Sequence, residues 1–225
     1  MCELKLFSKT SKDYKQYKCL RGAIIILEGS IGVGKTTLGN KLCEFLNKIG
    51  LDARFYKEFV NESLLKLYIN NMKKHAFSFQ SIMARERRHI YLNAVEYSKT
   101  GGISIVDRGL IGDYVFAKMQ KDKNFIEDEE WKVYVDLVST ELPEPSMVLY
   151  MRAIPEISFL RMKHRNNESE KSGYTLKYFE DLHKTYDEVI KNCKYNHTTL
   201  DWNKDLQEIT DDKCRSVFDI LLQLQ

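Results

Sequence analysis

Residues 29–36 read Gly29-Ser30-Ile31-Gly32-Val33-Gly34-Lys35-Thr36, and this stretch decides the fold. It matches the phosphate-binding loop pattern GxxxxGK[S/T], with an apolar run before it and a helical pattern after it. The glycines let backbone N–H groups turn towards phosphate oxygens, and the N-terminus of the following helix adds a favourable dipole. Lys35 is expected to neutralise phosphate oxygens, and the Thr36 hydroxyl to bind Mg²⁺. The sequence therefore predicts a nucleotide site that extends from Gly29 to Thr37.

Short apolar runs alternate with longer helical patterns along the rest of the chain. This alternation is typical of β-α-β units, and it predicts an α/β protein with a parallel sheet. The expected strands are residues 23–27, 53–56, 103–106, 147–151 and 198–200. The expected helices are residues 35–49, 63–99, 131–140, 155–165, 176–192 and 204–222.

The composition limits the class of protein. The chain has 225 residues, of which 43% are hydrophobic and 30% charged, which is typical of one soluble globular domain. No apolar run reaches the length of a membrane span, and a net charge of +3 is too small to indicate nucleic-acid binding. The five cysteines are odd in number and scattered, which argues against disulfides or a zinc site and favours a reducing compartment. We therefore expect a cytoplasmic protein with neither a membrane nor a nucleic-acid partner.

Residues 1–21 differ from the rest because they contain six basic residues and only two acidic ones, Glu3 and Asp13. One interpretation is an arm that binds membranes or nucleic acid. The favoured interpretation is a solvated, partly mobile polar leader, because the lysines are spread out. We therefore divide the chain into this leader and a single domain, residues 22–225. Within that domain, residues 166–173 form the most loop-like stretch and are a candidate lid.

Polar residues stand at the ends of two expected strands. Glu58 lies just past the second strand, and Asp107-Arg108 directly follows the third. In open parallel sheets, ligands bind beyond the carboxyl ends of the strands. A carboxylate there could take the proton from an attacking hydroxyl, while an arginine stabilises charge on a transferring phosphoryl group. The alternative for each residue is an ordinary surface charge at a strand end.

Two groups of residues recur at helical spacing. One face of the helix expected over 63–99 carries Gln80, Met83, Ala84 and Arg87. This mixture would suit a nucleobase; the alternative is a half-buried amphipathic helix from which Arg87 extends to solvent. Arg161 and Arg165 lie four residues apart before the candidate lid. They could clamp phosphates, or they could form a solvated helix face.

The ordered set of motifs resembles the deoxynucleoside kinase family, nearest its deoxycytidine/deoxyguanosine/deoxyadenosine kinase branch; large DNA viruses carry relatives. The resemblance extends from residue 22 to about residue 222, and it is carried by residues 28–37, 58–60, 77–81, 107–108, 113–118, 149–152, 176–178 and 200–203. It implies a P-loop fold with a five-stranded parallel sheet flanked by helices, a short arginine-containing lid, and a homodimer. It also implies a nucleotide-salvage activity, in which the γ-phosphate of ATP is transferred with Mg²⁺ to the 5′-hydroxyl of a deoxynucleoside.

The resemblance further implies a role for each candidate residue. Glu58 corresponds to the general base, Arg108 to the arginine that steadies the reacting phosphate and the 5′-oxygen, and Asp107 to the acidic partner near Mg²⁺. The remaining positions match residues for the base (Phe79, Gln80, Met83, Arg87, Asp113 and Phe116), the sugar (Tyr68 and Glu170), the lid (Arg161 and Arg165) and the adenine of ATP (Asn203, Lys204 and Asp205).

Several positions depart from the family pattern. Phe59 and Ser63 stand where the family often has Pro and Trp, Gly109 replaces a serine after Asp107-Arg108, and Asn167 replaces the second arginine of the lid. The sugar-binding tyrosine aligns with Ile69, so the neighbouring Tyr68 is assigned that role.

The Arg87–Asp113 pair predicts the preferred base. Its donors and acceptor suit deoxycytidine or a purine deoxynucleoside, whereas thymine has no exocyclic amine for the carboxylate. Two other functions stay open. One is a nucleoside monophosphate kinase of the thymidylate kinase type, although Glu58 would repel the phosphate of such an acceptor. The other is a non-catalytic nucleotide-binding subunit on the same scaffold, which the intact Lys35, Thr36, Glu58 and Arg108 argue against.

Overall fold

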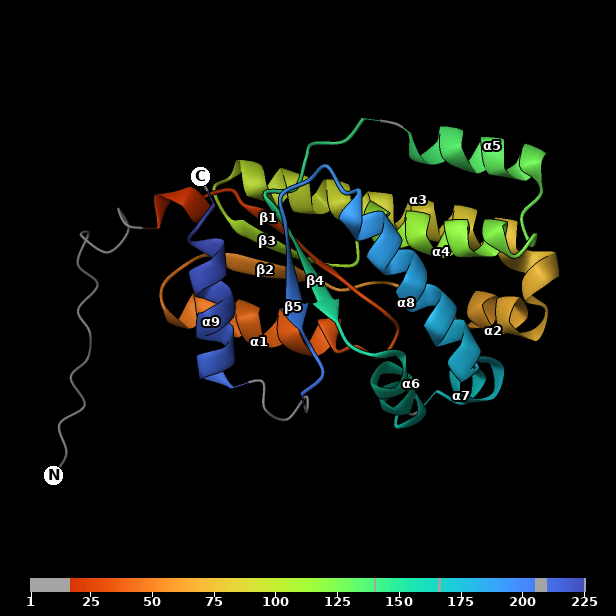
Figure 1. The fold of residues 1–225 in the computed structure, drawn as a ribbon. Coiled ribbons are helices and arrows are strands. Elements are labelled where there is room, and N and C mark those ends of the chain that lie inside the picture. Colours follow the sequence, from red (N-terminus) through yellow and green to blue (C-terminus); the bar gives the residue numbers. More distant parts are fainter. Residues whose placement is uncertain (1–16, 140, 166, 205–209, 225) are drawn as a thin grey trace, which may run out of the picture.

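A parallel sheet of five strands lies at the centre of the molecule (Figure 1). The structure is a computed structural model, and it describes residues 17–139, 141–165, 167–204 and 210–224. The strands are β1 (Ile24–Glu28), β2 (Ala53–Tyr56), β3 (Ile103–Asp107), β4 (Met147–Arg152) and β5 (His197–Asp201). They are ordered β2-β3-β1-β4-β5, and every neighbouring pair is parallel. All five expected strands are confirmed, with ends that differ by no more than one residue from the sequence prediction.

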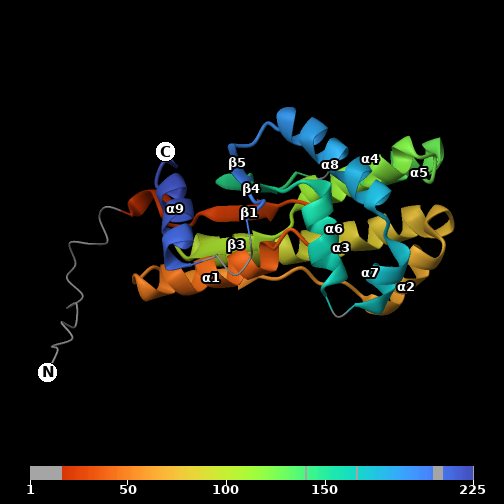
Figure 2. The same cartoon turned by 60° about the horizontal axis from the view of Figure 1, so that its bottom comes forward.

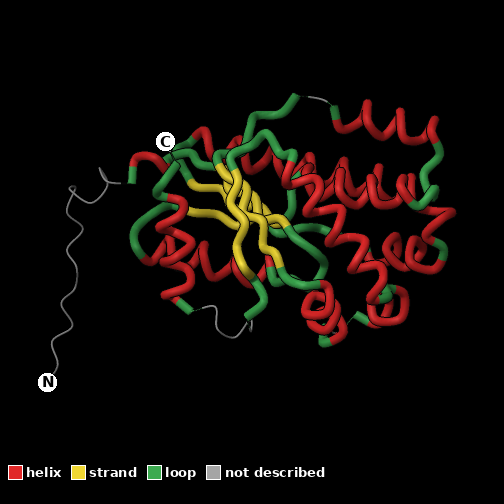
Figure 3. Tube along the Cα trace, viewed as in Figure 1, coloured by secondary structure: helices red, strands yellow, loops and turns green. Residues whose placement is uncertain are grey.

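Helices cover both faces of this sheet (Figures 1 and 3). One face packs against α1 (Lys35–Lys48), and α9 (Asp211–Leu221) packs beside α1. The other packs against α3 (Met72–Lys99), with α4 (Leu110–Asp122), α5 (Asp128–Val138) and α8 (Leu176–Lys191) around it. Successive residues of a strand point to opposite faces, so Ile25 and Leu27 join the first core and Ile24 and Ile26 the second. Burial on both sides explains why β1 reads as an unbroken apolar run before Glu28.

Three shorter helices lie near the carboxyl ends of the strands: α2 (Glu62–Asn70), α6 (Pro155–Lys163) and α7 (Glu168–Gly173). Helices α2 and α7 lie side by side, and α6 adjoins α7 (Figure 2). The loop between β1 and α1 opens at the same end of the sheet, so these helices surround the predicted nucleotide site. No helix within the described residues has the length and apolar character needed to cross a membrane.

The prediction of a single helix over residues 63–99 is wrong, because the chain breaks at Asn71 (φ −151°) into α2 and α3. Each of the two helices has its own N-cap. The Asn61 side chain accepts a hydrogen bond from the Leu64 N–H at 3.0 Å, and the Asn71 side chain accepts one from the Lys74 N–H at 3.1 Å. Asparagine caps of this kind favour a new helix start over continuation of the old one.

Helix α4 is absent from the sequence prediction, although Ile111, Val115, Phe116 and Met119 are buried at helical spacing. It places Asp113 and Phe116 next to α3 and α8. The helix expected over 131–140 begins earlier, at Asp128, where Glu127 and Glu130 form a capping box.

The stretch expected to be a loop over 166–173 contains the short helix α7. Its N-cap is Asn167, whose side chain accepts a hydrogen bond from the Glu170 N–H at 3.1 Å. The last helix, predicted over 204–222, is α9 in the structure and begins at Asp211. Residues 205–209 lie outside the described residues.

The described residues begin at Tyr17, before Gly22, where the predicted domain starts. Residues Lys18–Leu20 form one turn of 3₁₀ helix, and Leu20 is fully buried. The ring of Tyr17 packs edge-on against Phe218 of α9, with 5.3 Å between the ring centres. Residues 17–21 therefore pack on the side of the sheet that α1 and α9 cover, whereas residues 1–16 lie outside the described residues.

Candidate active site

Glycines shape the loop between β1 and α1. Gly29, Gly32 and Gly34 have φ values of 147°, 76° and 109°, a region that L side chains rarely adopt. Lys35 begins α1, and its Nζ donates hydrogen bonds to the carbonyl oxygens of Gly29 at 3.2 Å and Ser30 at 3.0 Å. Burial lowers the pKa of Lys35 to about 7. The lysine thus lies over its own loop, with the helix N-terminus beside it, in the arrangement that anion-binding loops use.

Thr36 and Asp107 meet beside this loop. The Thr36 hydroxyl donates a hydrogen bond to Asp107 Oδ2 at 2.5 Å. The second carboxylate oxygen, Asp107 Oδ1, is buried and has no hydrogen-bond partner among the described residues. Hydroxyl and carboxylate oxygens are the ligands that Mg²⁺ prefers, so Thr36 and Asp107 would suit a magnesium ion. Within the described part of the chain, no group of three or more His, Cys, Asp or Glu side chains could hold a metal.

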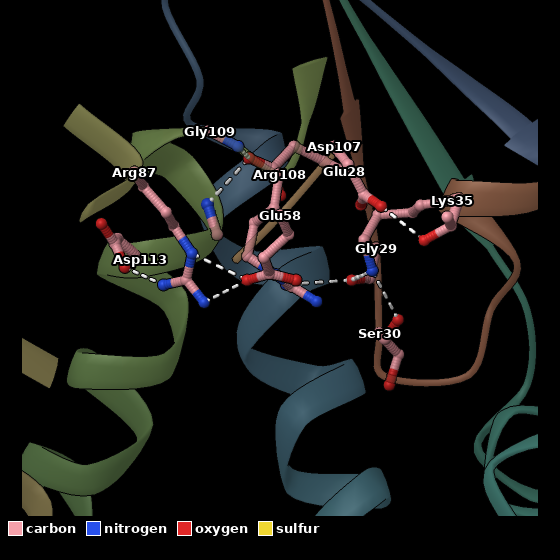
Figure 4. A network of polar contacts seen from close by, with 12 residues as sticks. Glu28, Gly29, Ser30, Lys35, Glu58, Arg87, Asp107, Arg108, Gly109 and Asp113 are labelled. Atoms are coloured by element: carbon pink, nitrogen blue, oxygen red, sulfur yellow. Dashed lines mark hydrogen bonds and ion pairs between the residues drawn. The ribbon is translucent and has the colours of Figure 1, made fainter. Parts of the chain in front are cut away.

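Glu58 lies between two arginines (Figure 4). Its Oε1 accepts hydrogen bonds from both the Nε (2.8 Å) and an Nη atom of Arg87, and from Arg108 Nε at 3.1 Å. Burial acts to raise the pKa of this carboxyl, but Arg87, Arg108 and Lys35 outweigh it and lower the pKa to about 2. Glu58 is therefore a carboxylate at neutral pH, and the alternative of a solvated surface charge is wrong.

Arg108 has an unusual backbone conformation for a non-glycine residue, with φ 67°. Its Nη1 donates to the Gly29 carbonyl oxygen at 3.1 Å and to the Tyr186 hydroxyl, and its guanidinium lies 4.7 Å from the ring centre of Phe116. The acidic and phenolic neighbours raise its pKa despite its burial. The side chain is thus a fixed cation between the phosphate-binding loop and Glu58.

Arg87 joins Glu58 to Asp113, since its Nη1 also donates to Asp113 Oδ1. Burial raises the pKa of Asp113 to about 6, and the neighbouring Arg87 opposes this rise. The side chain of Arg87 is 7% exposed. The interpretation in which Arg87 extends to solvent is therefore wrong, because two carboxylates hold the guanidinium inside the protein.

The rest of the predicted helical face is also buried. Gln80, Met83 and Ala84 have exposed fractions of 1%, 1% and 3%. Gln80 Nε2 has no hydrogen-bond partner in the part of the chain that the structure describes. An unpaired buried amide is costly unless a ligand or water satisfies it, so this group is available to a polar molecule in the site.

These side chains meet in one cavity of about 200 Å³ at the carboxyl end of the sheet. Most of the residues predicted for the site contribute to its wall: Ile31, Gly32, Lys35, Thr36, Glu58, Tyr68, Phe79, Gln80, Met83, Arg87, Asp107, Arg108, Phe116, Arg165 and Glu170. Asp113 is not part of the wall and lies behind Arg87. The cavity therefore joins the phosphate-binding loop to a polar pocket beneath α3 and α4.

Residues 25–220 match the family model described as "Deoxynucleoside kinase". The chain belongs to the deoxynucleoside kinase family. The family and the P-loop fold predicted from the sequence are thereby confirmed.

Curated relatives include a deoxyadenosine kinase and a probable thymidylate kinase. A curated deoxyadenosine kinase of Dictyostelium discoideum is 29% identical over 180 residues, which cover 79% of this chain and 70% of that protein. A probable thymidylate kinase of Saccharolobus solfataricus is 28% identical over 188 residues, which cover 83% of this chain and 92% of that protein. The solved structure of deoxyadenosine kinase from M. mycoides with dCMP and dCDP bound has a TM-score of 0.70 at 22% identity, and the match covers 88% and 98% of the two chains. The last likeness shows the shared fold.

In this deoxynucleoside kinase the predicted sugar residue, Tyr68, is buried and lines the cavity. Its ring stacks on Phe79, with 4.4 Å between the ring centres. Its hydroxyl accepts a hydrogen bond from Gln120 Nε2 at 2.7 Å and lies 3.4 Å from the Tyr178 hydroxyl. The hydroxyl of Tyr68 therefore already has two polar protein partners, Gln120 and Tyr178.

The two arginines predicted for the lid lie in different places. Arg165 lines the cavity near Glu170. Burial raises the pKa of Glu170, and Arg165 opposes that rise. Arg161 instead donates to the backbone oxygens of Val33 (3.1 Å), Trp202 (3.0 Å) and Lys204, and so joins the phosphate-binding loop to the segment after β5.

The predicted adenine loop is only partly described. The Asn203 side chain accepts a hydrogen bond from the Ile154 N–H at 2.9 Å and donates one to Asp201 at 2.7 Å. Asp205 lies outside the described residues. Asn203 and Lys204 are near Arg161 but do not line the cavity.

Some residues of the site were missed. Tyr174 and Tyr178 line the cavity, and Glu28 and Tyr186 hold Arg108 from behind. The sequence carries little sign of these roles, because Tyr178 and Tyr186, at helical spacing in α8, read as ordinary core, and Tyr174 directly follows α7. Glu28 ends an apolar run directly before the phosphate-binding loop, and a charged residue at such a buried position is the one signal that was present.

Proposed function

We propose that this kinase transfers the γ-phosphate of ATP to the 5′-hydroxyl of a deoxynucleoside in the cavity between the phosphate-binding loop and α3. The observation that carries the proposal is the position of Glu58. It is held as a carboxylate by Arg87 and Arg108 on the wall of the same cavity as Lys35.

Each group has a defined part in the proposed reaction. Glu58 orients the 5′-hydroxyl and takes its proton as the bond to phosphorus forms. A weakly basic carboxylate suffices, because phosphoryl transfer with a loose transition state demands more positioning than base strength. Arg108 and Lys35 stabilise the negative charge on the transferring group. Mg²⁺, when bound at Thr36 and Asp107, supplies further neutralisation of the phosphate oxygens.

The base side of the cavity supports a preference for deoxycytidine or a purine deoxynucleoside over thymidine. Gln80 offers an unpaired amide, and Arg87 offers guanidinium donors whose position Asp113 fixes. Because Asp113 lies behind Arg87, it acts on the base through that arginine. The deoxyadenosine kinase of Dictyostelium discoideum supports this preference, whereas the probable thymidylate kinase favours the alternative.

A direct assay tests the function. The protein is incubated with Mg-ATP and each of the four deoxynucleosides or thymidine monophosphate, and the phosphorylated products are quantified. We expect monophosphate from deoxycytidine or a purine deoxynucleoside. Diphosphate formed from thymidine monophosphate alone would favour the thymidylate kinase alternative. ATP binding without any product would favour a non-catalytic subunit.

Three further features remain proposals: one kinase domain over residues 22–225, a cytoplasmic location, and a homodimer packed through its long helices. The dimer is supported by a groove of about 450 Å³ between α4 and α8, which Leu110, Tyr114, Val138 and Val189 line. Sedimentation of the purified chain tests it. A monomeric mass across the micromolar range would contradict the homodimer.

A further inference from the structure

Glu28 is the last residue of β1 and has no part in the reaction described above. It is fully buried and lies outside the cavity wall. Its Oε1 accepts hydrogen bonds from the N–H groups of Gly109 and Gly112, both at 2.9 Å, and its Oε2 accepts one from the Tyr186 hydroxyl at 3.2 Å. Burial raises its pKa, and Arg108 and the two glycine N–H groups oppose the rise. A buried carboxylate costs free energy unless hydrogen-bond donors surround it. The donors to Glu28 are two N–H groups that follow Arg108 in the chain and the hydroxyl of Tyr186, which also contacts Arg108.

The first link between Glu28 and Arg108 is through the backbone. Arg108 has φ 67°, which is strained for a residue with a side chain, so its neighbours must hold it there. Its own N–H donates to the Leu27 carbonyl oxygen at 3.0 Å, and the next N–H, that of Gly109, donates to Glu28. Glu28 also accepts the Gly112 N–H from the first turn of α4, which has no partner within that helix. The carboxylate therefore fixes the turn that carries Arg108 (Figure 4).

The second link is through Tyr186 of α8. Its hydroxyl accepts a hydrogen bond from Arg108 Nη1 and donates one to Glu28 Oε2. The same guanidinium donates through Nε to Glu58. A continuous chain of polar contacts thus runs from β1, through Tyr186 and Arg108, to the proposed base.

Close packing leaves the residues of this chain of polar contacts little room to move. A Cβ atom at Gly112 would lie 2.6 Å from Glu28 Oε2 and 2.9 Å from the Tyr186 oxygen. A Cβ atom at Gly109 would lie 2.8 Å from Ile26 Cδ1. The two glycines are therefore required for α4 to approach the carboxylate, and they allow Glu28 to hold the turn directly.

We propose that Glu28 and Tyr186 are positioning residues that fix Arg108 against Glu58 and the reacting phosphate. Neither residue lines the cavity, so both act through Arg108. The inference rests on the proposed function, in which Arg108 stabilises the transferring group.

The test uses Tyr186→Phe, which removes only the hydroxyl and leaves the bonds of Glu28 to the glycines. We expect kcat to fall about 10-fold, the size of effect that a hydrogen bond to a charged group produces, with the KM values for ATP and deoxynucleoside little changed. Tyr150→Phe is the matched control. Its ring stacks on Tyr186 with 5.5 Å between the ring centres, but its hydroxyl donates to Asp187 outside this chain of contacts. We expect it to keep wild-type kcat.

Glu28→Gln is the stronger change, because the neutral amide keeps the size but provides only one acceptor oxygen. We expect kcat to fall about 100-fold, as both links weaken. A thermal melt by circular dichroism checks that the variants are folded. If Glu28→Gln does not fold, Tyr186→Phe still decides the inference, since a buried ring remains in place.

A combined variant separates positioning from a merely structural role. In an Arg108→Lys background, which lacks the guanidinium fork, Tyr186→Phe should cause no further loss of kcat. The inference would be overturned if Tyr186→Phe reduced kcat by the same factor in the Arg108→Lys background as in wild type. A folded Tyr186→Phe variant with wild-type kcat would also overturn it. Either result would leave the kinase activity established. A wild-type protein that phosphorylates none of the four deoxynucleosides would overturn the proposed function and this inference with it.

Discussion

The two sides of the cavity are built in different ways. The phosphate wall, residues 29–36, is one continuous stretch in which backbone N–H groups, glycine conformations and one lysine form the site. The charged wall consists of Glu58, Arg87 and Arg108, which come from different elements and hold one another, with Asp113 behind Arg87. The phosphate wall needs only a local conformation. The charged wall needs several elements to pack correctly. It also needs the negative charges of two carboxylates to offset the positive charges of two arginines.

This difference decides how each wall responds to substitution. Removing a side chain from the phosphate wall removes a contact with ligand and leaves its neighbours in place. Removing one from the charged wall also leaves a buried partner charge uncompensated and shifts the pKa of that partner. The phosphate wall is therefore expected to show losses of activity with little change in stability. The charged wall is expected to show linked changes in activity, selectivity, pH dependence and stability.

The largest expected effect is on the phosphate wall. Lys35→Ala should reduce phosphoryl transfer by about 10³-fold or more, because the main cation on the β- and γ-phosphates is lost. The thermal midpoint should stay near that of wild type, because the hydrogen bonds of Nζ within the described residues go to loop carbonyl oxygens. Steady-state turnover and a circular-dichroism melt are measured together. Near-normal turnover would contradict the catalytic role of the loop.

The next largest effect is on Glu58. Glu58→Gln keeps the size of the side chain but removes the proton acceptor, so kcat should fall by roughly 10²–10⁴-fold. Glu62→Gln, an exposed position at the start of α2, is the control and should keep full activity. Binding of the deoxynucleoside is measured separately by calorimetry. A variant with weaker binding and unchanged kcat would make Glu58 a residue that only positions the substrate.

A third change tests selectivity. Replacing the pair by Arg87→Met with Asp113→Ala should shift the ratio of kcat/KM values towards thymidine by about 10- to 100-fold, because apolar volume replaces the polar pair. Arg85→Met, at an exposed position on the same helix, is the control. Competition assays with mixed deoxynucleosides give the ranking. If the double variant loses stability but keeps the wild-type ranking, the pair is only a buried salt bridge. Thymidine as the best wild-type substrate would contradict the predicted preference.

The smallest expected effect is on pH dependence. The folded-state pKa of Glu58, about 2, lies below the ordinary value of 4.5, so the stabilisation from its ion pairs is present above pH 4.5 and is lost as the pH falls towards 2. Without Arg87 the pKa of Glu58 should rise by about one unit or more, since an opposite charge has been removed.

The acid limb of kcat/KM should therefore move to higher pH in the double variant. Profiles of kcat/KM against pH for wild type, Arg85→Met and the double variant measure the shift. A double variant with the wild-type acid limb would show that Arg87 does not control the ionisation of Glu58.

The same contrast explains what could be predicted from the sequence. The phosphate wall was found whole, because its residues are contiguous and their spacing is itself the signal. Glu58 and Arg108 could be proposed because they follow strands, and the carboxyl ends of parallel strands meet. The spacing of Gln80 and Arg87 showed a shared face, but whether that face was buried depended on where Glu58 and Asp113 lie in space.

Contacts between distant residues could not be predicted. Glu28 accepts hydrogen bonds from residues 81, 84 and 158 positions further along the chain, and no local pattern marks such pairings. The Tyr68 hydroxyl likewise depends on Gln120, a residue of a helix that was not predicted. Helix α4 was overlooked although its apolar spacing was present, and the break at Asn71 was overlooked although asparagine is a common N-cap.

The strand order also has a consequence for how this protein folds. Central strand β1 pairs with β3 and β4, so its register joins residues 24–28 to residues 104–107 and 147–150. Parallel strands cannot be joined by a tight turn, and each pairing must close a long loop before it gains any hydrogen bonds. During synthesis β1 has no neighbour until β3 has been made, and the sheet is complete only after β5. The chain should therefore fold slowly compared with a helical bundle of similar size, and its apolar central strand stays exposed to aggregation until those distant segments arrive.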